Sequence, residues 1–141
     1  MSKRLATPYT RGKSDVIDNA APYNGTPVAE GLAVCKHSDG SIKAVSSAAD
    51  IVVGVAAVAE HKRQSFVRCG LEVYVLLAED AQPQKGAAVY VDAQGKFTEK
   101  AQTQETDNIA VNAVFASEKE ICLNSKGENS FAAAIDFPGG L

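Results

Sequence analysis

The chain has 141 residues, which is the usual size of one domain and enough to bury a core without disulfide bonds or a structural metal. Hydrophobic residues make up 45% of it and charged residues 22%, which excludes a disordered or fibrous protein. The longest apolar run, residues 51–59, is far shorter than the roughly 20 residues that cross a bilayer, so we expect no membrane partner. The N-terminus lacks the apolar stretch of a secretory signal, and we therefore expect synthesis in the cytosol.

The first 26 residues are predicted to form an extended basic arm. Residues 1–14 contain Lys3, Arg4, Arg11 and Lys13 and no acidic residue, whereas residues 15–141 carry ten basic and 17 acidic groups, a net charge of −7. The arm is rich in turn-forming residues and has no apolar periodicity before about residue 28. We expect it either to fray, as chain ends commonly do, or to order against a partner surface that carries acidic patches.

Residues 27–141 are predicted to form a single all-β domain. Alternating side chains and turn signals such as Asp39-Gly40, Gln94-Gly95 and Lys126-Gly127 recur about every ten residues. In residues 131–137, Phe131, Ala133, Ile135 and Phe137 share one face, which predicts a half-buried strand. The expected fold is a jelly-roll-like sandwich or a compact β-barrel of eight to ten short strands. The predicted strands cover residues 33–36, 41–45, 64–69, 71–77, 88–91, 96–98, 120–123 and 131–137.

Residues 51–59 are compatible with two elements. The stretch Ser47-Ala-Ala-Asp50 before them resembles a helix N-terminal cap, and good helix formers follow. Four of the nine residues are valine, however, and Gly54 interrupts the run, so a strand is favoured.

Two stretches of the domain resemble one another. Residues 31–42 align without a gap on residues 86–97, so that Gly40 and Gly95 occupy the same hairpin position. Each copy then continues to an acidic residue and an apolar run, which matches Asp50 with Asp107. The pattern indicates either a duplicated three-strand unit or two hairpins that look alike because glycine serves both turns.

The residues that carry chemistry elsewhere do not form a catalytic or metal motif here. The three cysteines are far apart and are expected to be buried core residues, and His37 and His61 have no metal-ligand spacing. The adjacent acids Glu79 and Asp80 have no nucleophile beside them. The acidic body, without tryptophan or basic runs, argues against a nucleic-acid partner. We therefore expect neither an enzyme nor a cofactor or metal site.

Five segments of valine, alanine and glycine at strand and turn positions follow one another over roughly residues 25–125. The segments are Val28-Ala-Glu-Gly-Leu-Ala-Val, Asp39-Gly-Ser-Ile-Lys-Ala-Val, Asp50-Ile-Val-Val-Gly-Val-Ala-Ala-Val-Ala, Val67-Arg-Cys-Gly-Leu-Glu-Val-Tyr-Val and Gly86-Ala-Ala-Val-Tyr-Val-Asp. Each motif is low in information, but their order along the chain resembles that of the head decoration, or cement, proteins of tailed bacteriophages.

This resemblance implies a structural protein of the virion that lies on the outer surface of an icosahedral head. Its partner would be the major capsid protein, and it would act as a homo-oligomer, with a dimer expected first and a trimer second. The alternative from another class is a carbohydrate- or receptor-binding β module of a phage fibre or adhesin, for which six percent aromatic residues is a thin supply. The residues expected to contact the capsid lie at the two chain ends: Lys3, Arg4, Tyr9, Arg11, Lys13, Tyr23, Phe137 and Leu141.

Overall fold

A computed structural model describes residues 3–4, 17–22, 26–60, 63–101, 107–124 and 126–141. The regular elements in these ranges are all strands, as the sequence predicts. They are β1 (Lys3–Arg4), β2 (Ile17–Pro22), β3 (Ala33–Lys36), β4 (Ile42–Ala44), β5 (Val52–Glu60), β6 (Arg63–Leu76), β7 (Ala88–Val91), β8 (Phe97–Thr98), β9 (Ile109–Phe115), β10 (Glu120–Leu123) and β11 (Asn129–Phe137).

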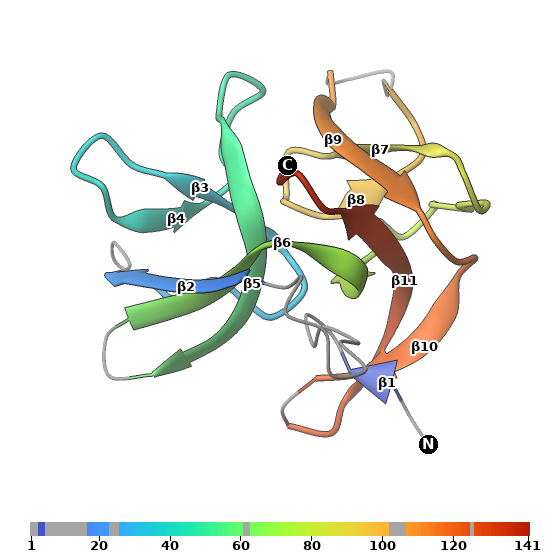
Figure 1. The fold of residues 1–141 in the computed structure, drawn as a ribbon, viewed down its shortest axis with the longest axis horizontal. Coiled ribbons are helices and arrows are strands. Elements are labelled where there is room, and N and C mark those ends of the chain that lie inside the picture. The colour runs from blue at the N-terminus through green and yellow to red at the C-terminus, as the bar shows by residue number, and fades with distance from the viewer. Residues whose placement is uncertain (1–2, 5–16, 23–25, 61–62, 102–106, 125) are drawn as a thin grey trace.

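The strands form one sheet in the order β4-β3-β5-β6-β11-β9-β7-β8, with β2 paired to β6 and β10 paired to β11. Every pairing along this path is antiparallel, and the path does not close into a barrel. Figure 1 shows the first half, with β2 to β5, and the second half, with β7 to β11, on either side of the long strand β6. The all-β prediction is confirmed, and the two halves pack in the manner of a sandwich.

Strand β6 joins the two halves because it changes direction near its middle. Glu72 has a φ of 53°, a left-handed conformation that is costly for a residue with a Cβ atom. Its N–H donates a hydrogen bond of 2.7 Å to Oδ1 of Asp136, at the position where the register of β11 also shifts. Before this bend β6 pairs with β5, from Arg63 to Val67, and β11 pairs with β6 on both sides of the bend, at Gly70 and from Val73 to Leu76. Residues 64–69 and 71–77, predicted as two strands, are thus parts of one bent strand.

The main core lies between the two halves and is apolar throughout. It takes side chains from β3 and β5 of the first half and from β7, β8, β9 and β11 of the second. A smaller cluster of Tyr74, Cys122, Ala132 and Ala134 covers the opposite face of β11. The prediction that residues 131–137 form a half-buried strand is therefore wrong, because apolar neighbours cover Ala132 to Ile135 from both sides.

The internal repeat is present in the structure. In the first unit, the β3–β4 hairpin pairs through β3 with β5, and β5 pairs with β6. In the second unit, the β7–β8 hairpin pairs through β7 with β9, and β9 pairs with β11. The two units therefore have the same strand order and the same antiparallel connections, running inward from the two ends of the sheet.

Hydrogen bonds repeat at the same positions of the two units. Gly40 donates to the carbonyl of His37 over 2.9 Å, and 55 positions later Gly95 donates to that of Asp92 over 3.0 Å. Both glycines have a positive φ, 86° and 81°, which the tight hairpin turn requires. The sequence match of residues 31–42 with residues 86–97 is thus a match in backbone conformation as well.

In the third strand of each unit, equivalent residues are further apart in the sequence than they are in the hairpin. The N–H of Ala56 donates to the carbonyl of Leu32 over 2.8 Å, and that of Phe115 donates to the carbonyl of Ala87 over 2.9 Å. Ala56 and Phe115 are 59 positions apart while Leu32 and Ala87 are 55 apart, so the second unit has a loop four residues longer. With a separation of 59, the equivalent of Asp50 is position 109, so the sequence match of Asp50 with Asp107 is wrong by two positions.

Two pieces of the predicted arm are strands of the sheet. Strand β2 pairs antiparallel with β6 from Ile17↔Cys69 to Pro22↔Arg63, and β1 pairs in parallel with the edge strand β10. The sequence pattern did not indicate these strands, because main-chain hydrogen bonds at a sheet edge require no alternation of side chains. Residues 17–22 therefore belong to the sheet, whereas the sequence assigned them to an arm that ends at residue 26.

Candidate functional site

The C-terminal residues form a closed turn, not the free contact that the sequence suggested. Phe137 is fully buried in the main core, and Leu141 is half-buried against it. Gly140 donates to the carbonyl of Phe137 over 2.9 Å, and Asn112 donates to the carbonyls of Gly140 and Leu141, each over 3.4 Å. Phe137 thus fills the core and offers no exposed surface to a partner in this structure, and Leu141 is held in the same turn.

The predicted residues of the arm fall into two groups. Lys3 and Arg4 form β1, where Lys3 is the register partner of Cys122 and Arg4 that of Leu123. The other four, Tyr9, Arg11, Lys13 and Tyr23, lie outside the described residues. In Figure 1 the strand β1 lies beside β10 and the start of β11, at the end of the molecule where the N-terminus is marked.

This same end carries two large apolar side chains in contact with solvent. Ile121 of β10 is 60% exposed and Phe131 of β11 is 55% exposed, and the two are register partners across the antiparallel pair. Cross-strand partners have Cβ atoms about 5 Å apart, so the two side chains form one surface. We call Ile121 and Phe131 the β10–β11 patch. Sequence reasoning missed it because Phe131 alternates in step with the buried Ala133 and Ile135.

A basic side chain borders this patch. The Nζ atom of Lys119 lies 4.4 Å from the centroid of the Phe131 ring, within the range of a cation–π interaction. The interaction restrains the aromatic ring and brings a positive charge to the edge of the patch.

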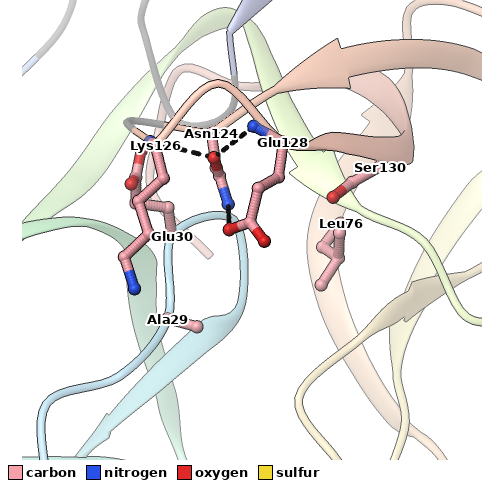
Figure 2. Close-up of a pocket in the computed structure, with 7 residues that line it drawn as sticks. All are labelled: Ala29, Glu30, Leu76, Asn124, Lys126, Glu128 and Ser130. Carbon is pink, nitrogen blue, oxygen red and sulfur yellow. Dashed lines mark hydrogen bonds between the residues drawn. The ribbon is translucent and has the colours of Figure 1, made fainter.

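A surface depression beside the β10–β11 turn has a volume of about 300 Å³ (Figure 2). Asn124 organises the turn: its Oδ1 accepts hydrogen bonds from the N–H groups of Lys126 and Glu128, and its Nδ2 donates to the Glu128 carboxylate, each over 2.9 Å. The polar atoms of this side chain serve the turn, not a ligand. The full lining is Ala29, Glu30, Leu76, Asn124, Lys126, Glu128 and Ser130.

A second depression of about 290 Å³ is lined by Gln82, Pro83, Gln84, Glu118 and Lys119. Neither lining contains an aromatic side chain of the kind that stacks on sugars. The first depression therefore has a mixed polar and apolar lining, which includes Ala29 and Leu76, and the second has a mainly polar one.

The candidate acid/base residues are engaged in surface contacts. Asp80 accepts a hydrogen bond of 2.8 Å from Nζ of Lys100, and this contact lowers the pKa of Asp80. His37 is exposed, with its Nδ1 atom 3.4 Å from Oδ1 of Asp39. His61 lies outside the described residues. Among the described residues, no group of three or more His, Cys, Asp or Glu side chains is arranged to hold a metal ion.

The three cysteines are core residues, as predicted. Cys35, Cys69 and Cys122 are all buried and none is in a disulfide bond. Burial, together with the nearby charge of Asp50, raises the pKa of Cys35 to about 11. A thiol in this state is a poor nucleophile at neutral pH.

No helix among the described residues is long and apolar enough to span a membrane.

Comparison with solved structures identifies a similar fold. The chain superposes on a chain of the structure described as "The capsid of Myoviridae Phage XM1" with a TM-score of 0.72 and 16% sequence identity. The match covers 100% of this chain and 94% of that chain, so the two folds correspond from end to end. No protein-family model matches the sequence, and no curated protein matches it.

Proposed function

We propose that this protein is a structural component of a phage head: a cement, or decoration, protein on the outer surface of the icosahedral shell. There it would stabilise contacts between major capsid protein subunits. The observation that carries the proposal is the end-to-end fold similarity to a chain of a phage capsid of nearly equal length. The order of sequence motifs across residues 25–125 supports it independently.

The packing of the described residues agrees with this role. A cement protein needs a rigid body and several modest contacts, because contacts repeated on a symmetric lattice add through effective concentration. The bent strand β6 and the shared core make the body rigid, since both halves contribute side chains to one apolar cluster. A homodimer is the oligomer we expect first, with a trimer second.

The basic arm supplies one contact in this proposal. Its charged residues Lys3, Arg4, Arg11 and Lys13 suit an acidic region of the shell, and Tyr9 and Tyr23 are its aromatic anchors. In the described part of the arm before β2, two register pairs join β1 to β10, so little of this main-chain pairing would be lost if the arm moved onto a neighbouring subunit.

The direct test is cosedimentation of the purified protein with phage heads that have been stripped of it, together with the heat resistance of the loaded heads. Saturable binding and a rise in heat resistance are expected, and the saturation level gives the copy number. Absence of binding by folded protein would overturn the proposal. A glycan array would then test the carbohydrate-binding alternative.

Deletion of residues 1–14 tests the arm separately. The truncated protein is expected to remain folded and soluble, because the six-residue pairing of β2 with β6 is retained, but to bind heads more weakly. The difference between the two proteins should shrink as salt screens the four lost charges. Unfolding of the truncated protein would instead identify residues 1–14 as part of the core.

A further inference from the structure

The β10–β11 patch is an exposed apolar surface with a defined structure. Ile121 and Phe131 are adjacent across the two strands, and both backbones are held in the sheet by the register that continues to Cys122↔Ser130 and Leu123↔Asn129. The other large apolar side chains exposed in the described part of the chain lie elsewhere, Ile51 directly before β5 and Val114 in β9. The patch is therefore a pair of rigidly mounted side chains.

The charges beside the patch define the chemistry of its partner. Lys119 lies over the Phe131 ring, and β1, with Lys3 and Arg4, is the next strand beyond β10. Glu118 and Glu120 are the sequence neighbours of Lys119, so the positive charge that the structure places at the patch is that of Lys119 over the ring. A complementary surface would offer an apolar depression to the two side chains and a carboxylate to Lys119.

The size of the patch distinguishes between two occupants, a second copy of the chain and a subunit of the shell. Two half-exposed side chains leave on the order of 200 Å² to be covered, whereas a stable dimer buries about 800 Å² on each partner. The patch alone is too small to hold a second copy. It suits a contact that is repeated many times on a lattice and is reinforced by a neighbouring contact, such as the arm that begins beside it.

We propose that the β10–β11 patch is an anchor for the shell, with Phe131 and Ile121 docked into a carboxylate-rimmed apolar depression on the major capsid protein. This inference rests on the proposed function, because it names a second contact of the same attachment. It differs from the arm contact in that it is rigid and apolar, and it should therefore persist at high salt.

The test compares three variants of the full chain in the cosedimentation assay with stripped heads. The double variant Ile121→Thr/Phe131→Thr keeps β-forming residues and is expected to bind at least tenfold more weakly with an unchanged thermal midpoint. The control Ile51→Thr removes a more exposed apolar side chain elsewhere and should bind like the wild type. Phe131→Leu keeps an apolar anchor and should retain most of the binding.

Each contrary result has a distinct meaning. If the double variant binds heads as tightly as the wild type does, the proposed anchor is overturned and the proposed function is left intact. A change in oligomeric state of the double variant by sedimentation, with shell binding unchanged, would overturn the choice of the shell and identify a second copy as the occupant. Failure of the wild type to bind would overturn the proposed function, and this inference with it.

Discussion

The two repeated units have the same strand order but bury different faces. In the first unit the row Ala33, Val55 and Val67 crosses three neighbouring strands, and all three side chains are fully buried. In the second unit the equivalent row is Ala88, Val114 and Asp136, in which Val114 is 45% exposed. The same backbone thus presents one row to the core and the other to solvent.

The opposite faces of the two units explain this difference. In the first unit, Val34, Ile42, Ala56 and Phe66 form a separate cluster that is closed by Val28. Their equivalents in the second unit all belong to the main core: Val89, Phe97, Phe115 and Ile135. The first unit is therefore covered on both faces, whereas the second leaves the row Ala88, Val114 and Asp136 in contact with solvent. A repeated backbone does not impose repeated packing, because the neighbouring sheet determines which face is buried.

The largest expected difference between the units is at Gly54 and its equivalent Ala113. A Cβ atom at position 54 would lie 2.6 Å from both Cδ2 of Phe66 and the carbonyl oxygen of Val67. Because a backbone atom cannot move aside easily, Gly54→Ala is expected to lower the free energy of unfolding by about 3 kcal/mol or more. Ala113→Gly should cost only about 0.5–1 kcal/mol. Urea unfolding of both variants measures this contrast, and equal effects would contradict the close packing against Gly54.

A second contrast uses the valines of the two rows. Val55→Ser removes a fully buried side chain and buries a hydroxyl group, so it is expected to cost about 2–3 kcal/mol of stability. Val114→Ser alters a half-exposed side chain and should stay within about 0.5 kcal/mol of the wild type. The measurement is the free energy of unfolding in urea. A large loss at Val114 would mean that the outer face of the second unit is covered in solution.

The smallest effect concerns the loop before β5, which is held by a carboxylate. Burial by itself would raise the pKa of Asp50. Hydrogen bonds from the N–H groups of Ser46 and Ser47, at 2.8 and 3.0 Å, and from Lys43 outweigh it and lower the pKa to about 2. A depressed pKa stabilises the folded state above pH 3.8, and this contribution is lost as the pH falls towards 2.

The stability involved is about 1–2 kcal/mol after allowance for solvent screening. Asp50→Asn should therefore be less stable than the wild type at neutral pH, and the difference should close between pH 4 and pH 2. Thermal unfolding at several pH values measures it. A constant difference across this range would show that the carboxylate charge is not responsible.

Buried Gln64 illustrates what the sequence pattern could not reveal. Its Oε1 accepts a hydrogen bond from the N–H of Val28, and its Nε2 donates to the carbonyls of Ala57 and Ser65. This single amide joins β5, β6 and the segment before β3. In the sequence it is one more polar residue in an alternating strand, since the partners that satisfy it are distant along the chain.

The candidate surface was predictable in part. The sequence places basic residues in the arm, and the structure pairs two of them, Lys3 and Arg4, with β10. The sequence assigned Phe131 to the core because it alternates with Ala133 and Ile135. The core ends before position 131, however, and alternation cannot indicate where a core ends. Strand β9 was missed for a related reason: alanine or valine occurs on both of its faces, so the contrast between faces is weak.

The sequence by itself determined the local features of this protein: the all-β class, the glycine hairpins, the choice of strand over helix at residues 51–59, the repeat and the buried cysteines. These depend on steric preferences and side-chain periods that act within a few residues. Only the tertiary structure decided that β6 bends through Glu72 to join two halves, which face of each unit is buried, that Phe137 closes the core and that Phe131 faces solvent. These outcomes depend on which strands become neighbours, and packing between residues far apart in the sequence sets that.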